Sequence, residues 1–489
     1  MDFDRIVQWI LRRDPVRWAL GAMVVVWSLV FIVLGLRHHD RFGTFGFDLG
    51  LWDQGIWLLS RFETPFITLR GLDFWGHHMN PVLLLFVPFY WLGAGAQFLL
   101  VVQVLAQASG AVAIYLLARD RLADRWLAVA LGGVLLLHPS YQFQTWWFFH
   151  PDSLAVAPLL FAYWAARAKR WRWYAVAAVL AVACKEEVAL AIAVMGVLVA
   201  LRDDRRIGAL TTALALAWFA LSTRVIIPRA NGIGTFYESF FGEFGNTPTE
   251  VLRSVVTHPG KAFDTATKPD RMDYYRMMFA PVAFLPLFAI RVMLIGAPML
   301  AINVLSVIGY HRQIRYQYST LVIAALMLAT VEAIATIAER PGLRRFLVGL
   351  VVVTSFGATV AWGPSPVSTK FRSGLWELTD SPRNDVKRQA IALVPEDAPT
   401  SAAYYVVPHM AHRTRIYEFP VPWRPSNWGV RGENLHDPAE VQWLVLDRSV
   451  LGEEDKNLLS RLLASEFVVR FDQDGIMVAE RVSPPLPPA

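Results

Sequence analysis

The chain has 489 residues, of which 55% are hydrophobic and only 18% are charged, and its mean hydropathy is +0.39. The apolar residues come in runs long enough to enter or span a bilayer, which excludes an ordinary soluble protein. The net charge of +6 is expected to reside in loops that set membrane orientation rather than in a nucleic-acid surface. A single cysteine, Cys184, excludes an intramolecular disulfide and a cysteine-based metal site.

The first apolar run, residues 18–36, follows several arginines and predicts an uncleaved membrane helix with a cytoplasmic N-terminus. It is too long for the core of a signal peptide, and no small-residue cleavage site follows it. Residues 37–95 then form the first outer loop. Within this loop, 81–92 is apolar but short and holds two prolines, which predicts a re-entrant or interfacial helix. A second span is expected at 96–118.

Polar turns interrupt the next two apolar regions, 127–168 and 173–201. The first contains two His-Pro pairs, and the second contains Lys185-Glu186-Glu187. A single helix over 173–201 would hold these charges near the bilayer centre, at a cost of roughly 2.5–3.5 kcal/mol each. We therefore expect each region to form two short helices with the polar turn on the outer side.

The remaining spans complete an all-α polytopic membrane domain over residues 1–363 with about eleven transmembrane helices. They are expected at 207–227, 277–290, 292–309, 318–338 and 346–362, with a long polar loop at 229–275. This arrangement brings the basic clusters 119–125, 167–172, 202–206 and 340–345 to the cytoplasmic side, as the positive-inside rule requires. It leaves the C-terminus outside the plasma membrane.

The composition changes near residue 364, where apolar runs shorten and charged residues and prolines increase. Strands are predicted at 401–407, 415–419, 441–446, 467–471 and 476–479, and helices at 384–394 and 453–464. Asp474-Gly475 between the last two strands is a hairpin signal. Residues 364–482 therefore predict a small extracytoplasmic α/β domain, and 483–489 a disordered tail.

This topology brings most of the unusual polar residues to one face of the membrane. They are Asp48, Asp53, His77, His78, His150, Asp152, Lys185, Glu186, Glu187, His311, Arg312 and Arg315. Asp48 is a candidate general base for an acceptor hydroxyl, or else the N-cap of the helix that follows it. Asp53 is either a supporting residue or a solvated helix residue.

The histidines allow two interpretations each. His77 and His78 can orient a phosphate or join a metal site with a carboxylate, or they can cap the helix that begins near Pro81. His150 and Asp152 fit a functional role, and they fit equally well the start of a helix whose dipole Asp152 complements.

Three basic residues are candidates for binding a phosphate. Arg312 and Arg315 are suited to this because guanidinium groups match phosphate oxygens bidentately, although headgroup anchoring is the alternative. Lys185, with Glu186 and Glu187, is either functional or part of an exposed outer turn. No nucleotide-binding loop motif is found, which argues against ATP-driven transport.

Several motifs together resemble one family. These are FDLGLWDQGIW, GHHMNPVLLLFVPFYWL, FHPDSLAVAPLL and CKEEVAL, followed by VPEDAPTSAAYYVVPHMAHRTRIYEFP and WLVLD. In this order they resemble the bacterial predicted membrane proteins grouped as domain of unknown function 2079. That family is similar in layout to GT-C glycosyltransferases, which use polyprenyl-phosphate sugars and carry an acidic catalytic base in the first outer loop.

The resemblance implies an inverting transfer of sugar from a polyprenyl-phosphate donor to a cell-envelope acceptor, with membrane lipid and no nucleic acid as partners. Asp48 matches the base, and Arg315, with Arg312 as the alternative, matches the residue that contacts the lipid phosphate. Lys185 is our own additional candidate for stabilising the leaving phosphate. The paired acidic residues of several such enzymes are not present at 48–49.

Further roles stay open. His409 and His412 in the outer domain are candidates for binding acceptor, and a divalent cation, Mg²⁺ or Mn²⁺, is one option for acidic or His residues. The alternatives to a transferase are a transporter or flippase of a lipid-linked sugar, and a non-catalytic cell-envelope scaffold.

Overall fold

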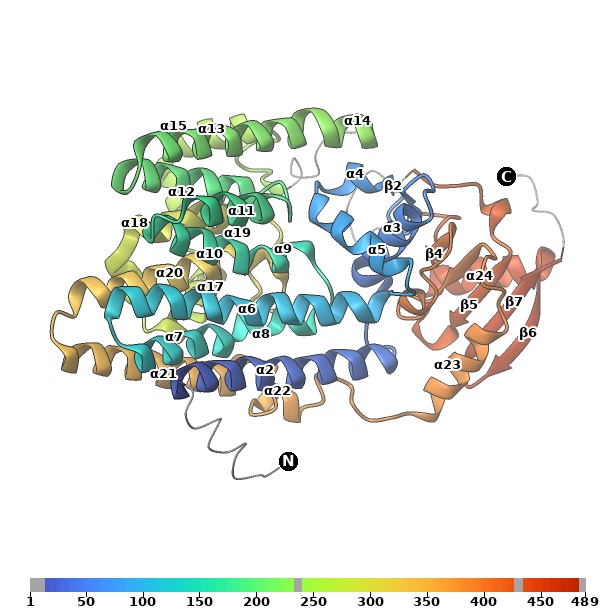
Figure 1. Cartoon of the computed structure of the whole chain (residues 1–489). Coiled ribbons are helices and arrows are strands. Elements are labelled where there is room, and N and C mark those ends of the chain that lie inside the picture. The colour runs from blue at the N-terminus through green and yellow to red at the C-terminus, as the bar shows by residue number, and fades with distance from the viewer. Residues whose placement is uncertain (1–13, 233–239, 426–433, 483–489) are drawn as a thin grey trace, which may run out of the picture. The chain divides into compact units, whose positions relative to one another are not determined.

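A computed structural model describes residues 14–232, 240–425 and 434–482. It divides into two compact units (Figure 1). The helical unit comprises the described residues of Met1–Val33, Val102–Ser222 and Tyr237–Leu375. The mixed unit comprises those of Leu34–Val101, Thr223–Phe236 and Trp376–Ala489, and it contains all the strands of the described chain.

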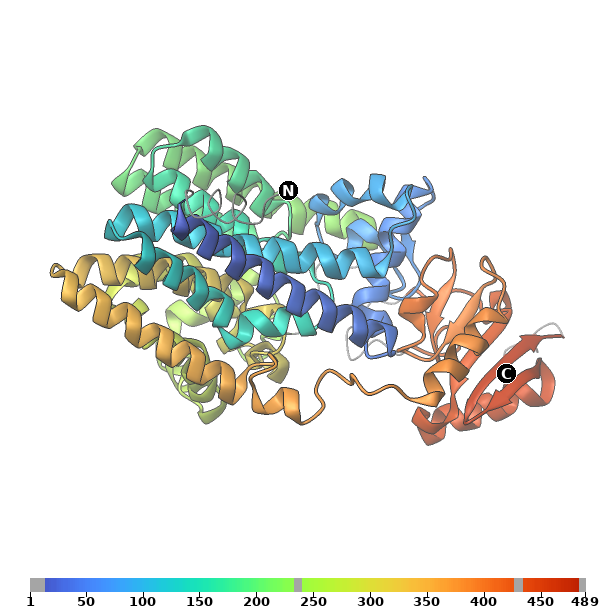
Figure 2. The same cartoon turned by 60° about the horizontal axis from the view of Figure 1, so that its bottom comes forward.

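Long helices form most of the helical unit. They are α2 (Pro15–Asp40), α6 (Ala96–Leu122), α7 (Arg125–Leu137), α10 (Val156–Arg167), α11 (Trp171–Val182), α12 (Val188–Arg202), α13 (Arg205–Leu221), α19 (Ala297–Leu305), α20 (Thr320–Ile337) and α21 (Pro341–Trp362). Helix α20 is almost wholly buried, and α21 runs back alongside it after a short turn (Figures 1 and 2). Helix α21 also packs on α7.

Six helical segments of the described chain are long and apolar enough to cross a membrane, or seven if the bent pair α7 and α8 (Pro139–Trp146) is one span. The expected count of about eleven is therefore not confirmed. Helices α11 and α12 have 12 and 15 residues, so each rises only about 18–23 Å, less than the roughly 30 Å hydrocarbon core. The two passes expected at 277–309 contribute a single candidate span, Leu285–Leu305.

The predicted breaks at polar turns are confirmed. Helices α11 and α12 are separate, and Lys185-Glu186-Glu187 lies between them. The region 127–168 breaks at Pro139, where α8 begins, and at Pro151, where the short α9 (Pro151–Leu154) begins. Proline favours the first turn of a helix because its missing N–H has no partner to lose there.

The polar loop expected at 229–275 is mostly helical, and the described residues between Asn231 and Leu285 include no candidate membrane span. The loop contains α15 (Pro248–Thr257), α16 (Pro259–Ala266) and α17 (Pro269–Phe279), after α14 (Ile227–Asn231). Helices α15, α16 and α17 each begin at a proline. Their polar composition hid the helices from a search for apolar runs.

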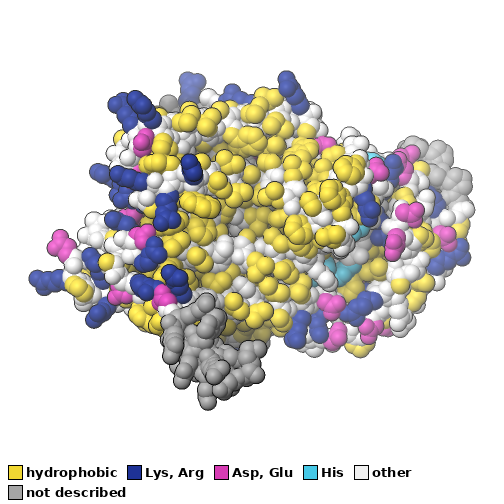
Figure 3. Space-filling view, viewed as in Figure 1, with side chains coloured by type: hydrophobic (Ala, Val, Ile, Leu, Met, Phe, Trp, Pro, Cys, Tyr) yellow, Lys and Arg dark blue, Asp and Glu magenta, His cyan; other side chains and the backbone are white. Residues whose placement is uncertain are grey.

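The basic turns of the helical unit meet at one end. Arg121, at the end of α6, pairs with Glu332 of α20 at 2.8 Å, and Arg167, at the end of α10, lies 3.7 Å from the same carboxylate. Arg167 also pairs with Asp203, after α12, at 2.5 Å. Arg344 of α21 donates to the last residue of α6 at 3.0 Å. Lys and Arg side chains gather at this end (Figure 3, left), so the four basic clusters share one side of the unit, as expected.

The mixed unit is built on a five-stranded sheet with the order β4-β3-β5-β7-β6. The strands are β3 (Thr400–Ala402), β4 (Ile416–Glu418), β5 (Trp443–Asp447), β6 (Phe467–Gln473) and β7 (Ile476–Arg481). Strands β4, β3 and β5 are parallel, and β7 is antiparallel to β5 and β6. The helices α23 (Pro382–Ala392) and α24 (Glu453–Ser465) match the predicted ones.

Two details of the sheet test the predicted strands. The β6–β7 hairpin is confirmed, and both Asp474 and Gly475 have positive φ, 50° and 81°, as a two-residue type I′ turn requires. The strand expected at 401–407 is shorter, because the chain leaves the sheet after Ala402 and forms the 3₁₀ turn η10 (Val407–His409).

The first outer loop folds against this sheet within the mixed unit. It contains α3 (Leu51–Ser60), the two-stranded β1 (Phe66–Ile67) and β2 (Leu72–Asp73), α4 (Phe74–His77), and the short η2 (Pro81–Phe86) and α5 (Val87–Tyr90). Thr68 donates to the carbonyl of Ile416 in β4 at 2.6 Å, and Gly46 N donates to the carbonyl of Tyr404 at 2.8 Å. The loop is therefore a packed layer rather than a free connection.

Candidate functional site

Asp48 lies in a single π-helical turn, η1 (Gly46–Gly50), immediately before α3. The turn continues directly into α3, whose N-cap is Gly50, so Asp48 stands in the first turn of this helical stretch. A carboxylate there also suits the positive end of the helix dipole, so both interpretations of Asp48 stay predictions. The turn packs tightly on η10: a Cβ on Gly46 would approach Val407 Cγ1 to 2.7 Å and Glu418 Oε2 to 3.3 Å. Glycine at 46 thus permits the close approach that holds the Asp48 turn in place.

Asp53 is buried on α3, with only 3% of its side chain exposed. Its Oδ1 accepts a hydrogen bond from the hydroxyl of Tyr90 at 2.7 Å and lies 3.1 Å from Nε2 of His412. The His412 side chain is 40% exposed and its ring stacks on Trp57. Asp53 is thus no solvated helix residue. It holds one edge of an imidazole that is partly exposed.

Sequence reasoning missed this group because its members are far apart in the chain. Asp53 and His412 are separated by 359 residues, and no local spacing links an aspartate on one helix to a histidine in a distant loop. The one available signal was the charge of Asp53 in a mostly apolar helix.

His409 occupies a different environment from His412. Its ring stacks on His39 at 4.2 Å with an interplanar angle of 12°, and it contacts the tilted ring of Phe42 at 4.2 Å. Burial, with the neighbouring His39 and two basic side chains, holds the pKa of His409 well below its usual value. A neutral imidazole inside an aromatic stack is the arrangement of a packing residue.

His77 and His78 lie beside Trp52, with ring centroids 5.4 Å and 6.5 Å from the indole. His77 is the last residue of α4 and His78 is the C-cap of that helix, whereas the helix that begins at Pro81 has Asn80 at its N-cap. Among the described residues, no group of three or more His, Cys, Asp or Glu side chains is arranged to hold a metal ion. The donor set therefore gives no support to the Mg²⁺ or Mn²⁺ option.

Lys185 lies in a buried carboxylate cluster of the helical unit. Its Nζ is 3.0 Å from Asp152 Oδ2 and 3.2 Å from Glu187 Oε2, and its side chain is 7% exposed. Burial alone would lower the pKa of Lys185, but Asp152, Glu187 and Glu186 raise it well above its usual value. The alternative of an exposed outer turn is wrong.

His150 and Asp152 begin α9, as the helix-start alternative predicts, and Asp152 additionally binds Lys185. The His150 backbone N–H donates to Gln103 Oε1 at 2.7 Å. Burial, followed by the charges of Lys185 and Arg312, lowers the pKa of His311 to about 3. These groups therefore belong to one polar region of the helical unit.

Arg312 and Arg315 differ in how their charges are used. Arg312 is 8% exposed, pairs with Asp270 at 2.7 Å and donates to the carbonyl of Ser306 at 2.7 Å. Arg315 is exposed and donates to Gln313 Oε1 at 2.8 Å. Within the described part of the chain, no carboxylate lies in ion-pairing distance of Arg315, so its charge is available to an anion.

A second cation near Arg315 was not foreseen. Lys370 lies on α22 (Thr369–Arg372), with its ammonium 5.0 Å above the ring of Phe143. Burial, followed by the positive charge of Arg315, lowers the pKa of Lys370. Its position after the last membrane helix gave no sequence signal of this neighbourhood.

The six or seven candidate spans of the described chain and the small α/β sheet define a polytopic membrane protein with an extramembrane domain. Two solved structures of ArnT from Cupriavidus metallidurans are similar to it, one bound to undecaprenyl phosphate (TM-score 0.52) and one in the apo state (TM-score 0.54). Each is 14% identical, and the match covers 94% of this chain and 98% of ArnT. Likeness at this identity shows the fold alone.

A weaker similarity, with a TM-score of 0.39, is to the Archaeoglobus fulgidus oligosaccharyltransferase in complex with Zn and sulfate. It is 14% identical over 91% of this chain and 71% of that one. No curated protein matches the sequence. The chain belongs to the family of predicted membrane proteins named domain of unknown function 2079, whose profile matches residues 38–478. The resemblance drawn from the sequence motifs is thus confirmed.

Proposed function

We propose that the protein is a membrane glycosyltransferase that transfers a sugar, with inversion, from a polyprenyl-phosphate donor to a cell-envelope acceptor. The observation that carries the proposal is the similarity of fold to ArnT over 94% of the chain, together with the undecaprenyl phosphate bound in one ArnT structure. The acceptor is a glycan, a lipid or a protein outside the cytoplasm.

The proposed orientation follows from charge. The basic end of the helical unit, where Arg121, Arg167 and Arg344 meet, faces the cytoplasm according to the positive-inside rule. The N-terminus is then cytoplasmic and the α/β domain extracytoplasmic, in the plasma membrane.

In the proposed reaction Asp48 is the general base. Its carboxylate takes the proton of an acceptor hydroxyl while the oxygen attacks the anomeric carbon and the bond from that carbon to the phosphate oxygen breaks. The turn that carries Asp48 is fixed by the close packing at Gly46, which suits a group that must meet its substrate in one geometry.

Arg315 is the proposed contact for the phosphate of the donor, where its charge stabilises the leaving group. It is favoured over Arg312 and Lys185 because both of those are buried and already paired with carboxylates. Arg312 instead binds Asp270 and the carbonyl of Ser306, and Lys185 binds Asp152. The partly exposed imidazole of His412, oriented by Asp53, is proposed to bind the acceptor.

The test is Asp48→Asn, which keeps the size of the side chain and removes the base. Purified protein would be assayed with undecaprenyl-phosphate hexoses and amino sugars and with envelope extract as acceptor. Loss of a general base is expected to lower turnover by about 10²–10⁴-fold. The matched control is Asp385→Asn, an exposed carboxylate on α23. Full activity of Asp48→Asn at normal expression would remove Asp48 from the reaction.

A further inference from the structure

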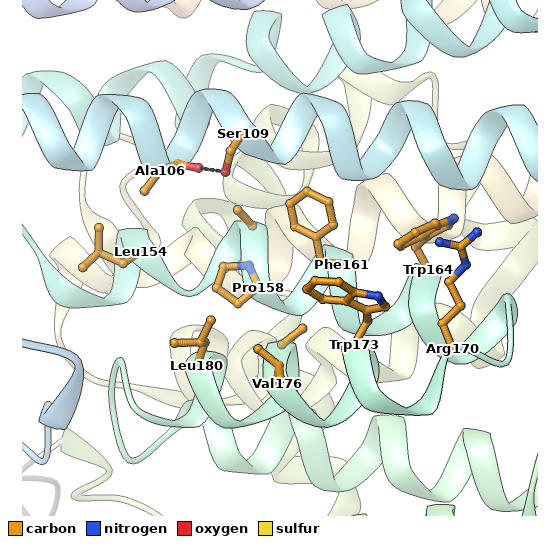
Figure 4. A pocket seen from close by; sticks show the side chains of 12 residues that line it. Ala106, Ser109, Leu154, Pro158, Phe161, Trp164, Arg170, Trp173, Val176 and Leu180 are labelled. Atoms are coloured by element: carbon orange, nitrogen blue, oxygen red, sulfur yellow. Dashed lines mark hydrogen bonds between the residues drawn. The ribbon is translucent and has the colours of Figure 1, made fainter. Parts of the chain in front are cut away.

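An apolar groove of about 580 Å³ runs between α6, α10 and α11 in the helical unit (Figure 4). It is lined by Ala106, Ser109, Leu154, Ala157, Pro158, Phe161, Trp164, Arg170, Trp173, Val176, Ala177 and Leu180. The volume is in the range of small-molecule sites. None of these residues has a role in the proposed reaction.

The groove is shaped by helical spacing. On α11 the lining positions are 173, 176, 177 and 180, and on α10 they include 157, 158 and 161, so each helix presents one face. Small residues, Ala106, Ala157 and Ala177, leave the space, and larger side chains rise around it. Since α10 has 12 residues, its length is about 18 Å, which suits an extended hydrocarbon chain.

The inside of the groove offers few polar partners to a ligand. The Ser109 hydroxyl donates to the carbonyl of Ala106 at 2.6 Å, and the Trp164 indole N–H donates to Asp120 at 2.9 Å. Both donors are therefore occupied, and the remaining lining is almost wholly apolar. An occupant must bury hydrocarbon rather than a sugar or a peptide.

One end of the groove is cationic. Arg170 lines it, with its guanidinium 5.2 Å above the ring of Trp164, and the exposed Lys169 and Arg172 are its neighbours in sequence. Trp173, 64% exposed, lies between Pro158 and Arg170 in Figure 4. No carboxylate in the described ranges pairs with Arg170. An exposed indole beside basic residues is typical of the headgroup depth of a membrane.

We propose that this groove binds one acyl chain of an anionic phospholipid, with the lipid phosphate held by Arg170. Hydrocarbon chemistry in the groove and an unneutralised cation at its end match the two parts of such a lipid. The site is separate from the proposed catalysis, and it stands or fails independently of the transferase assignment.

The experiment is native mass spectrometry of the detergent-purified full chain, delipidated and then titrated with phosphatidylglycerol or phosphatidylcholine of identical acyl chains. Arg170→Gln is expected to weaken phosphatidylglycerol binding about fivefold, since a basic residue near a charged headgroup contributes about 1 kcal/mol, and to leave phosphatidylcholine binding unchanged. The control is Arg345→Gln, an exposed arginine at the start of α21.

A second variant tests the groove itself. Ala177→Phe fills it and is expected to abolish retention of both phospholipids, whereas Val353→Phe, at an exposed apolar position of α21, retains them. Unchanged phosphatidylglycerol binding in Arg170→Gln, or retained binding in Ala177→Phe, would overturn the proposal. Preferential retention of undecaprenyl phosphate would also overturn it, by assigning the groove to a polyprenyl chain.

Discussion

Replacing Lys185 with methionine tests whether its charge holds the helical unit together. Methionine keeps most of the volume but removes the ammonium, which lies 3.0 Å from Asp152 and 3.2 Å from Glu187. The two carboxylates are only 13% and 10% exposed, so water compensates the lost charge poorly. Removing one partner of a buried ion pair costs about 3–5 kcal/mol.

The assay is thermal unfolding of the detergent-purified protein at a fixed scan rate, followed by tryptophan fluorescence. The cost corresponds to a fall in the unfolding midpoint on the order of 5–10 °C. Lys169→Met, which changes an exposed lysine, is the matched control. A second substitution, Asp152→Asn, is expected to restore part of the loss because it removes one of the unpaired charges.

The pH dependence gives a further check. In the native protein the raised pKa of Lys185 contributes stability that is present below its unfolded pKa of about 10.4 and is lost at higher pH. Equal unfolding midpoints for Lys185→Met and Lys169→Met would refute the reasoning. If Lys185→Met instead lost binding of the lipid phosphate without losing stability, Lys185 would be a phosphate-binding residue.

Three other outcomes are expected. Gly208→Ala should lower stability by about 1–3 kcal/mol, because its Cβ would lie 2.1 Å from the backbone N of Ala200. Gly349→Ala, with open space around it, should be neutral or slightly stabilising in the same melt. Gly475→Val, at φ 81°, should destabilise the hairpin by about 1–2 kcal/mol, seen as faster hydrogen exchange in β6 and β7. Burial would raise the pKa of Asp447, but hydrogen bonds from Ser449 and Tyr405 outweigh burial and lower it. The native protein therefore loses stability as the pH falls below about 4, and this loss should be smaller in Asp447→Asn.

Local signals predicted the elements that depend on local chemistry. The Asp474-Gly475 turn demands positive φ at two positions, and the sequence alone marks it. The break at Lys185-Glu186-Glu187 follows from the cost of charge in a bilayer. Helix length was harder to predict from the sequence. Hydropathy identifies an apolar run, but it does not show whether the run forms one full membrane span or a short helix such as α11.

The candidate site residues also fall into two groups: those that the local sequence predicts and those that only the tertiary structure shows. Asp48 could be selected from its place after the first apolar run, but the partners of Asp53 could not, because Tyr90 and His412 reach it through tertiary folding. The distinction between Arg312 and Arg315 also needed the structure. Both lie in one short basic segment, and only packing shows that Asp270 neutralises the first.

The bond between Asp53 and His412 has a consequence for synthesis of the chain. A ribosome adding about 5–20 residues per second makes the 359 residues between them in about 20–70 s. Throughout that interval the first outer loop exists without the strand that Thr68 contacts and without the imidazole that Asp53 holds. The first outer loop therefore reaches its final set of contacts only after residues 412–416 have been made.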